Sequence, residues 1–344
     1  MKTRIFFGIA AAIALAAPAT AWGPRGHMIV AAIAWSHLTP QTRAAVSRLL
    51  RHNPLYAQWT HGMHPGAARD QMAFVRAATW PDDIKGGQGY RRDDIHDKPP
   101  PGPEAMQNVA FDCIQHRYWH FEDIPFSRDG TPTEPPPAAN AEDRIRTFAA
   151  VLADRHASDA LKSYDLAWLI HLVGDAHQPL HATSRFTADG PVDNHRSDGG
   201  GNSIKGPGGR SLHAFWDGLP GNDASPTAAI QAAGAPPWNR PAPVAAAANL
   251  DPHAWLVDSE RLAEQHAYVA PVSERATDPF VPTAGYQSQA LDVAHDQIAL
   301  AGARLANMLN GAHIRVAGEP IADHTCHAAT SNPRPSTRPS RRHH

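Results

Sequence analysis

The chain is poor in cysteine, in net charge and in long hydrophobic runs. It has only two cysteines in 344 residues, too few for a metal site built from cysteine ligands. Its formal net charge is −2, so overall charge cannot hold a polyanion, and a role with phosphates would need local cations, including bound metal ions. Beyond the N-terminal segment no apolar run is long enough to span a membrane. We therefore expect a protein without stable membrane association.

The first 21 residues have the layout of a secretory signal peptide. Lys2 and Arg4 precede a short apolar run, which ends in the small residues Ala-Thr-Ala. We predict that residues 1–21 are removed, that the mature chain begins at Trp22, and that the protein is periplasmic or secreted. Without Lys2 and Arg4 the chain has 29 basic and 33 acidic residues, a formal charge of −4. In an oxidising compartment Cys113 and Cys326 could form one disulfide.

Alternating strand patterns are absent, whereas helical spacing recurs along the chain. The expected class is all-α, with a single compact multi-helix domain over residues 22–315, joined by loops rich in proline and glycine. The segment 316–344 is basic and rich in proline and serine towards its end, which predicts a disordered tail. The segments with helical spacing are 26–38, 39–52, 67–80, 141–157, 163–182, 251–270 and 289–310.

Histidine is abundant, with 22 residues, and several histidines stand at a regular spacing from an aspartate. In LIHLVGDAHQPLHA, His171 and Asp175 are four residues apart and would share one helix face. The same spacing recurs in SLHAFWDG. Counting a free amine at the new chain end, nine groups are candidate metal ligands: Trp22, His27, Asp82, His120, His171, Asp175, His181, His213 and Asp217.

A single His-x-x-x-Asp pair is most often a charge pair on a helix surface. Here two such pairs lie in otherwise apolar helices, where an unpaired buried carboxylate would cost several kcal/mol. Metal coordination is one of the few arrangements that remove this cost. Imidazole and carboxylate ligands without thiolate favour zinc in a hydrolytic site, although iron or manganese would accept a similar set.

Five segments together carry a family resemblance: WGPRGH, ATWPDDIK, YWHFED, HLVGDAHQPLH and GGN…LHAFWD. The chain resembles the secreted zinc-dependent single-strand-specific nucleases of the S-one/P-one type, also called 3'-nucleotidases. The resemblance implies an all-helical fold with three zinc ions. The first ion would be bound by Asp82, His120, His171 and Asp175; the second by Asp175, His27 and Trp22; and the third by His181, His213 and Asp217.

The resemblance gives Trp22 an unusual role, in which its α-amino nitrogen and carbonyl oxygen bind the metal and its indole does not. In the precursor this nitrogen belongs to a peptide bond. Cleavage after Ala21 would convert it into an amine with a pKa near 8, which can donate a lone pair. Export and metal assembly would then be coupled.

The resemblance also implies an activity, the hydrolysis of single-stranded DNA and RNA to 5'-mononucleotides together with 3'-nucleotidase activity. The expected enzyme is a monomer. Asp175 would bridge two zinc ions, and Lys85 would stabilise charge in the transition state. Phe121 would stack on a base and Asp123 would hydrogen-bond to it, while Asn202 would contact phosphate and base. Stacking tolerates any base, which suits a nuclease indifferent to sequence.

Two other functions remain open at this point. A zinc-dependent phospholipase C would use the same metal chemistry on lipid phosphodiesters. The segments WGPRGH and HFED favour the nuclease over this enzyme, and no amphipathic surface helix for lipid is evident. A non-enzymatic metal-binding protein would need no substrate groups near its metal. The side chains of Lys85, Phe121, Asp123 and Asn202 argue against this second alternative.

Overall fold

The computed structural model describes residues 22–326. The signal peptide expected over residues 1–21 and the end of the expected tail, residues 327–344, lie outside this range. The expected all-α class is confirmed. The strands of residues 22–326 are limited to β1 (Ile124–Phe126) and β2 (Thr183–Arg185), which pair in parallel. Within residues 22–326 there is no helix with both the length and the apolar character needed to cross a membrane.

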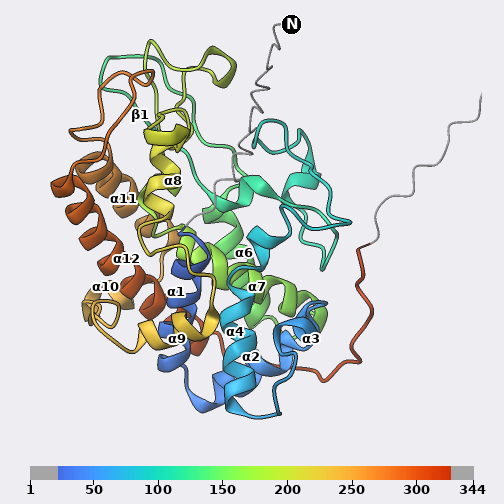
Figure 1. The fold of residues 1–344 in the computed structure, drawn as a ribbon. Coiled ribbons are helices and arrows are strands. Elements are labelled where there is room, and N and C mark those ends of the chain that lie inside the picture. Colours follow the sequence, from blue (N-terminus) through green and yellow to red (C-terminus); the bar gives the residue numbers. More distant parts are fainter. Residues whose placement is uncertain (1–21, 327–344) are drawn as a thin grey trace, which may run out of the picture.

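The long helices lie together in one body, and the loop-rich region around β1 and α8 lies at the opposite end from α2, α3 and α4 (Figure 1). The α-helices are α1 (Pro24–His37), α2 (Pro40–Leu50), α3 (Tyr56–Trp59), α4 (Ala67–Ala77), α5 (Trp80–Asp83), α6 (Ala141–Ala153), α7 (Asp159–Asp175), α8 (Leu212–Asp217), α9 (Pro226–Ala233), α10 (Val244–Ala248), α11 (Pro252–Leu262) and α12 (Ala284–Gly311). The other helical turns are η1 (Pro103–Met106), η2 (Arg117–His120), η3 (Pro179–His181), η4 (Val192–Asn194), η5 (Pro207–Gly209) and η6 (Ala263–Ala267).

Helix α7 is the central element. Ser158 caps its start by accepting a hydrogen bond from the backbone N–H of Leu161. Every residue from Lys162 to Asp175 is buried, because α1, α2, α5, α6 and α12 all pack around the helix. A helix that is covered on all sides has no face for solvated charges. The polar residues at its C-terminal end therefore lie deep inside the protein.

Helix α1 brings the N-terminal segment into the same core. It packs against α4, α9 and α12, and all of its residues from Gly26 to Trp35 are buried. The contact with α12 is close at Gly302, where a Cβ atom would lie 2.5 Å from Cγ2 of Ile33. The absence of a side chain at Gly302 thus lets the two helices approach each other.

The segment 163–182 differs in part from the expected helix. Helix α7 begins earlier, at Asp159, and ends at Asp175, before the single turn η3 and the strand β2. In this turn the side chain of Gln178 accepts a hydrogen bond from the backbone N–H of Leu180, and Pro179 has no N–H to continue the helix. The chain reverses here, which places His181 beside the end of α7.

The segment after α12 packs along the body of the protein. The carboxylate of Asp159 accepts backbone hydrogen bonds from Ala317, Gly318 and Glu319. Further on, Cys326 forms a disulfide with Cys113, the pairing that the sequence allowed. Residues 316–326 thus lack regular secondary structure but are held at both ends.

We expect Cys326→Ser to lower the free energy of unfolding by about 2–4 kcal/mol, because the disulfide restricts the unfolded chain. The bond joins residues that are 213 positions apart. Urea denaturation with and without a thiol reductant measures the effect. The reductant should destabilise the wild type by a similar amount and leave the variant unchanged. Equal stability of oxidised wild type and variant would contradict the expectation.

Candidate functional site

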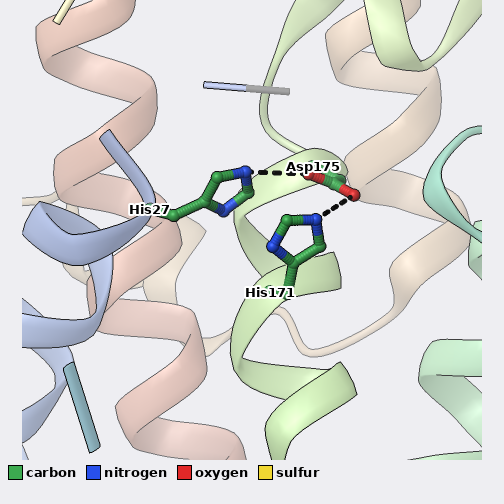
Figure 2. A group of neighbouring side chains, drawn as sticks. All are labelled: His27, His171 and Asp175. Atoms are coloured by element: carbon green, nitrogen blue, oxygen red, sulfur yellow. Dashed lines mark ion pairs between the residues drawn. The ribbon is translucent and has the colours of Figure 1, made fainter. Parts of the chain in front are cut away.

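The first group of candidate ligands surrounds the carboxylate of Asp175 at the end of α7. Nε2 of His27, from α1, lies 3.2 Å from Oδ1 of Asp175, and Nε2 of His171 lies 3.2 Å from Oδ2. Figure 2 shows the two imidazoles pointing to this carboxylate from different helices. The rings of His27 and His171 stack with centroids 3.9 Å apart. Residues far apart in the sequence therefore converge on one buried carboxylate.

A second group shares His171 with the first. Nδ1 of His120, from η2, lies 2.9 Å from Nε2 of His171 and 3.0 Å from Oδ2 of Asp175. Oδ1 of Asp82, from α5, lies 3.8 Å from Nε2 of His171 and also binds Nζ of Lys85 at 2.7 Å. Lys85 is one turn after Asp82, and its side chain is only 5% exposed. It places a buried positive charge beside the group.

A third group is formed by His181 of η3 with His213 and Asp217 of α8. Nε2 of His181 and Nε2 of His213 are 2.9 Å apart, and Nε2 of His213 lies 3.7 Å from Oδ2 of Asp217. Ser211 caps α8 through the backbone N–H of Ala214. One helical turn separates His213 and Asp217, so both project towards His181.

Backbone carbonyls fix the orientation of three of these imidazoles. Nδ1 of His171 lies 2.7 Å from the carbonyl oxygen of Ala78, Nδ1 of His181 lies 2.8 Å from that of His120, and Nδ1 of His213 lies 2.8 Å from that of Gly200. Because a carbonyl can only accept, each Nδ1 carries a proton, and in the neutral ring Nε2 then presents a lone pair. The lone pairs of His181 and His213 then face each other at 2.9 Å, which is favourable only with a shared cation.

Several buried polar atoms in the three groups have no hydrogen-bond partner among the described residues. An unpaired buried carboxylate oxygen or imidazole nitrogen is costly. Here these atoms gather at the points where the three groups converge, and they have the chemistry of metal ligands. They are Nε2 of His27, Oδ2 of Asp82, Nε2 of His120, Oδ1 of Asp175 and Oδ2 of Asp217.

The protonation states also suit a cation. Burial, followed by the charge of Lys85, lowers the pKa of His120 to about 3. Burial, followed by His181, lowers the pKa of His213 to about 3, so both rings are neutral at neutral pH. Burial opposes ionisation of Asp175, but the surrounding histidines hold its pKa well below the usual range. The eight side chains expected as ligands are thus assembled in three groups that could each hold a metal ion.

The ninth expected ligand, Trp22, is fully buried just before α1. The next residue is tied to α8, because the backbone N–H of Gly23 donates to the carbonyl oxygen of Asp217 at 2.7 Å. A Cβ atom on Gly26 would lie 2.5 Å from Cβ of Trp22, so glycine leaves room for the tryptophan. Binding of a metal through the backbone of Trp22 stays a prediction.

A cavity of about 620 Å³ adjoins the third group and contains the residues expected to bind substrate. Phe121, Asp123 and Asn202 line it, as does His213. Phe121 is also partly packed against the core. Burial, followed by the charge of Asp198, raises the pKa of Asp123 to about 7. The cavity therefore contains an aromatic ring, an amide and a titratable carboxyl, and it also reaches the candidate metal group of His213.

Some residues of the site were not expected from the sequence. Gln178 is fully buried, and its Nε2 donates to Oδ1 of Asp217 at 2.7 Å, which leaves Oδ2 of Asp217 on the side of His213. The carbonyl groups of Ala78 and Gly200 orient two imidazoles. Gln178 stands inside HQPLH and Gly200 inside GGGN, so their positions were within the motifs. Their contacts depend on how the chain folds back.

Two comparisons with known proteins agree with this arrangement. The sequence profile of a family described as S1/P1 Nuclease matches residues 22–313. The chain is also similar to a protein of Arabidopsis thaliana named Endonuclease 4, with 26% identity over 320 residues. This alignment covers 85% of the chain and 89% of the plant protein.

We expect Gly200→Ala to lower the free energy of unfolding by about 1–3 kcal/mol and to reduce the bound metal. The residue has φ +61°, and a Cβ atom there would lie 2.4 Å from the carbonyl oxygen of Leu180. Its carbonyl group, which orients His213, would have to move. Denaturant unfolding and metal analysis measure the two effects.

Gly208→Ala is the matched control. This glycine has φ +69°, but no atom lies within 4 Å of its expected Cβ position. The control should show the backbone strain alone, with the metal content of the wild type. If the two variants bind the same amount of metal, the carbonyl of Gly200 does not orient a ligand.

The helical turn η2, which carries His120, is stabilised by contacts of the preceding residue His116 that depend on pH. His116 is buried and stacks on Trp119, and its two ring nitrogens face Asp112 at 3.0 Å and Asp93 at 3.3 Å. Burial opposes protonation, but these two carboxylates raise the pKa of His116 above its ordinary value. The resulting stabilisation is fully present below about pH 6.5 and is lost as the pH rises through the folded-state value.

We therefore expect the difference in unfolding free energy between the wild type and His116→Gln to shrink as the pH rises from 6 to 9. Denaturant titrations of both proteins across this range measure it. A difference that is constant, or that grows with pH, would show that the imidazolium is not the stabilising form.

Proposed function

The chain belongs to the S1/P1 nuclease family, and on this basis we propose that it is a secreted zinc-dependent enzyme that hydrolyses single-stranded DNA and RNA to 5'-mononucleotides. Family membership makes it a nuclease, a hydrolase of phosphodiester bonds. The finer proposal adds three zinc ions, release of phosphate from 3'-nucleotides, and export.

The proposal is carried by one observation, that His213 belongs both to a candidate metal group and to the wall of the cavity. Phe121 and Asn202 line the same cavity. A substrate whose base lies on Phe121 would have its phosphate near the metal groups. A protein that only stored metal would have no use for this cavity.

The residues fit zinc. The donors are imidazole nitrogens and carboxylate oxygens without sulfur, and in each group one candidate ligand atom from every residue lies within 4.8 Å of the others. Asp82, His120, His171 and Asp175 would hold one ion. His27, Asp175 and the backbone of Trp22 would hold a second, and His181, His213 and Asp217 a third. When bound, zinc acts as a Lewis acid that activates water and offsets charge on phosphate oxygens.

The other residues act on the substrate. Lys85 is oriented by its ion pair with Asp82, so its charge is fixed before substrate arrives and can stabilise the extra negative charge of the transition state. Phe121 holds a base by stacking, which is worth about 1–3 kcal/mol per base. Asp123 hydrogen-bonds to the base, and Asn202 contacts base and phosphate through its amide.

The test of this function uses metal-loaded protein that begins at Trp22. We expect zinc in the purified protein, 5'-mononucleotides from denatured DNA and from RNA, and phosphate from a 3'-mononucleotide. A chelator should abolish all three activities. Release of phosphocholine from lipid without cleavage of nucleic acid would instead identify a phospholipase C. Zinc without activity on any phosphoester would identify a metal-binding protein.

We expect one extra alanine before Trp22 to lower activity at least tenfold and to reduce the zinc content. The extension replaces the amine by a peptide nitrogen, which has no lone pair to donate. The matched control is the same protein with a protease site that exposes Trp22, whose activity should return after cleavage. Equal zinc content and activity before and after cleavage would show that the terminal amine is not a metal ligand.

A further inference from the structure

The wall of the cavity carries three basic side chains. Arg92, Lys98 and Arg117 line the same cavity as Phe121 and Asn202. None of the three has a place in the proposed chemistry. The same cavity is also lined by four aspartates, Asp97, Asp123, Asp193 and Asp198, so an anion could bind only where a cation keeps free donors.

Arg117 is the cation of the three that is best placed to bind an anion. It begins η2, the turn that ends with His120, and only 21% of its side chain is exposed. Its Nε donates to Oδ1 of Asp97 at 2.8 Å. No hydrogen bond is found for its two terminal nitrogens anywhere in residues 22–326. A guanidinium that is held on one side and free at its fork is well suited to phosphate.

The neighbouring turn is built in an unusual conformation. Ile95 and Lys98 exchange two backbone hydrogen bonds of 3.0 Å, and between them His96 and Asp97 have φ of +52° and +60°. Two such residues normally include glycine or asparagine. Strain of this kind persists where a site requires it, and here the turn presents Asp97 to Arg117 and Lys98 to the cavity.

Two of the aspartates that line the cavity already have partners of their own. Asp97 is shared by Arg92 and Arg117. Asp198 is buried, and its Oδ1 accepts from the backbone of Arg185 and Gly201 and from the hydroxyl of Tyr268. Arg92 is largely engaged by Asp94. Lys98 has only a distant partner, Glu134 at 3.6 Å.

We propose that Arg117 and Lys98 form a second phosphate subsite, which holds a phosphodiester of the bound strand next to the one that is cleaved. The subsite rests on the proposed nuclease function and would make a polynucleotide a better substrate than a dinucleotide with one phosphate. The metal groups and Lys85 act on the reacting phosphate, whereas Arg117 and Lys98 bind a phosphate that does not react.

The experiment compares Arg117→Gln with the wild type on dTpdT, which has one phosphate between its sugars, and on pdTpdT and dTpdTpdT, which have one more. In the wild type the additional phosphate should lower KM by about tenfold, as expected for hydrogen bonds to a charged group. In Arg117→Gln this advantage should vanish, while KM and kcat on dTpdT stay within about twofold. The KM on a longer strand should also depend less on salt.

Two further variants separate binding from structure. Asp97→Asn keeps an oxygen that accepts from Nε of Arg117 but removes the negative charge beside it, and should enlarge the advantage of the additional phosphate, a gain that general damage would not produce. Arg51→Gln removes one exposed charge at the end of α2 and should leave all ratios unchanged. Loss of activity by Arg117→Gln on all three substrates alike, or an unchanged advantage, overturns the subsite.

If the proposed nuclease function is wrong, the phosphate subsite can still be tested separately. If the wild type cleaves none of these substrates, binding of fluorescent dT8 followed by anisotropy still tests the subsite. Arg117→Gln should then weaken binding by about tenfold and flatten its salt dependence. Equal affinities of wild type and variant would overturn the subsite independently of catalysis.

Discussion

The structure depends on the burial of three carboxylates and five imidazoles at the end of α7 with almost no compensating charge. The side chains of Asp82, Asp175 and Asp217 are all buried, and Lys85 pairs with Asp82 alone. Isolated carboxylates in such surroundings would cost several kcal/mol each. Bound cations would turn this cost into a stabilising interaction, and metal binding would then be thermodynamically linked to folding of the domain.

The rest of the fold holds the ligands in place for this purpose. Each comes from an element fixed by its own packing: His27 from α1, His171 and Asp175 from α7, and His213 and Asp217 from α8. Carbonyl groups then set the ring orientations, and Gln178 sets that of Asp217. Ligands fixed in this way need little rearrangement when a cation binds, which makes the site specific in geometry as well as in chemistry.

The sequence predicted the helices well and also which histidines and aspartates lie together, because both leave local signals; that these residues bind metal stays a prediction. A four-residue spacing such as that of His213 and Asp217 specifies one helix face without knowledge of the fold. The short strands β1 and β2 were not predicted, since three residues are too few to show a period. The contacts of Gln178 and Gly200, and the gathering of Arg92, Lys98 and Arg117, could not be predicted either. They depend on loops that meet only after the helices have packed.

The distribution of charge in the cavity follows from the same geometry. Groups that would bind cations are buried, and loss of water there strengthens each interaction with a metal. Arg117 and Lys98 are partly exposed and keep contact with solvent. A nucleic acid strand with one phosphate at the metal groups and another at Arg117 and Lys98 would be held at two points. Its bases would remain free to stack on Phe121. Recognition would then rest on the backbone and on base faces, which every nucleic acid sequence shares.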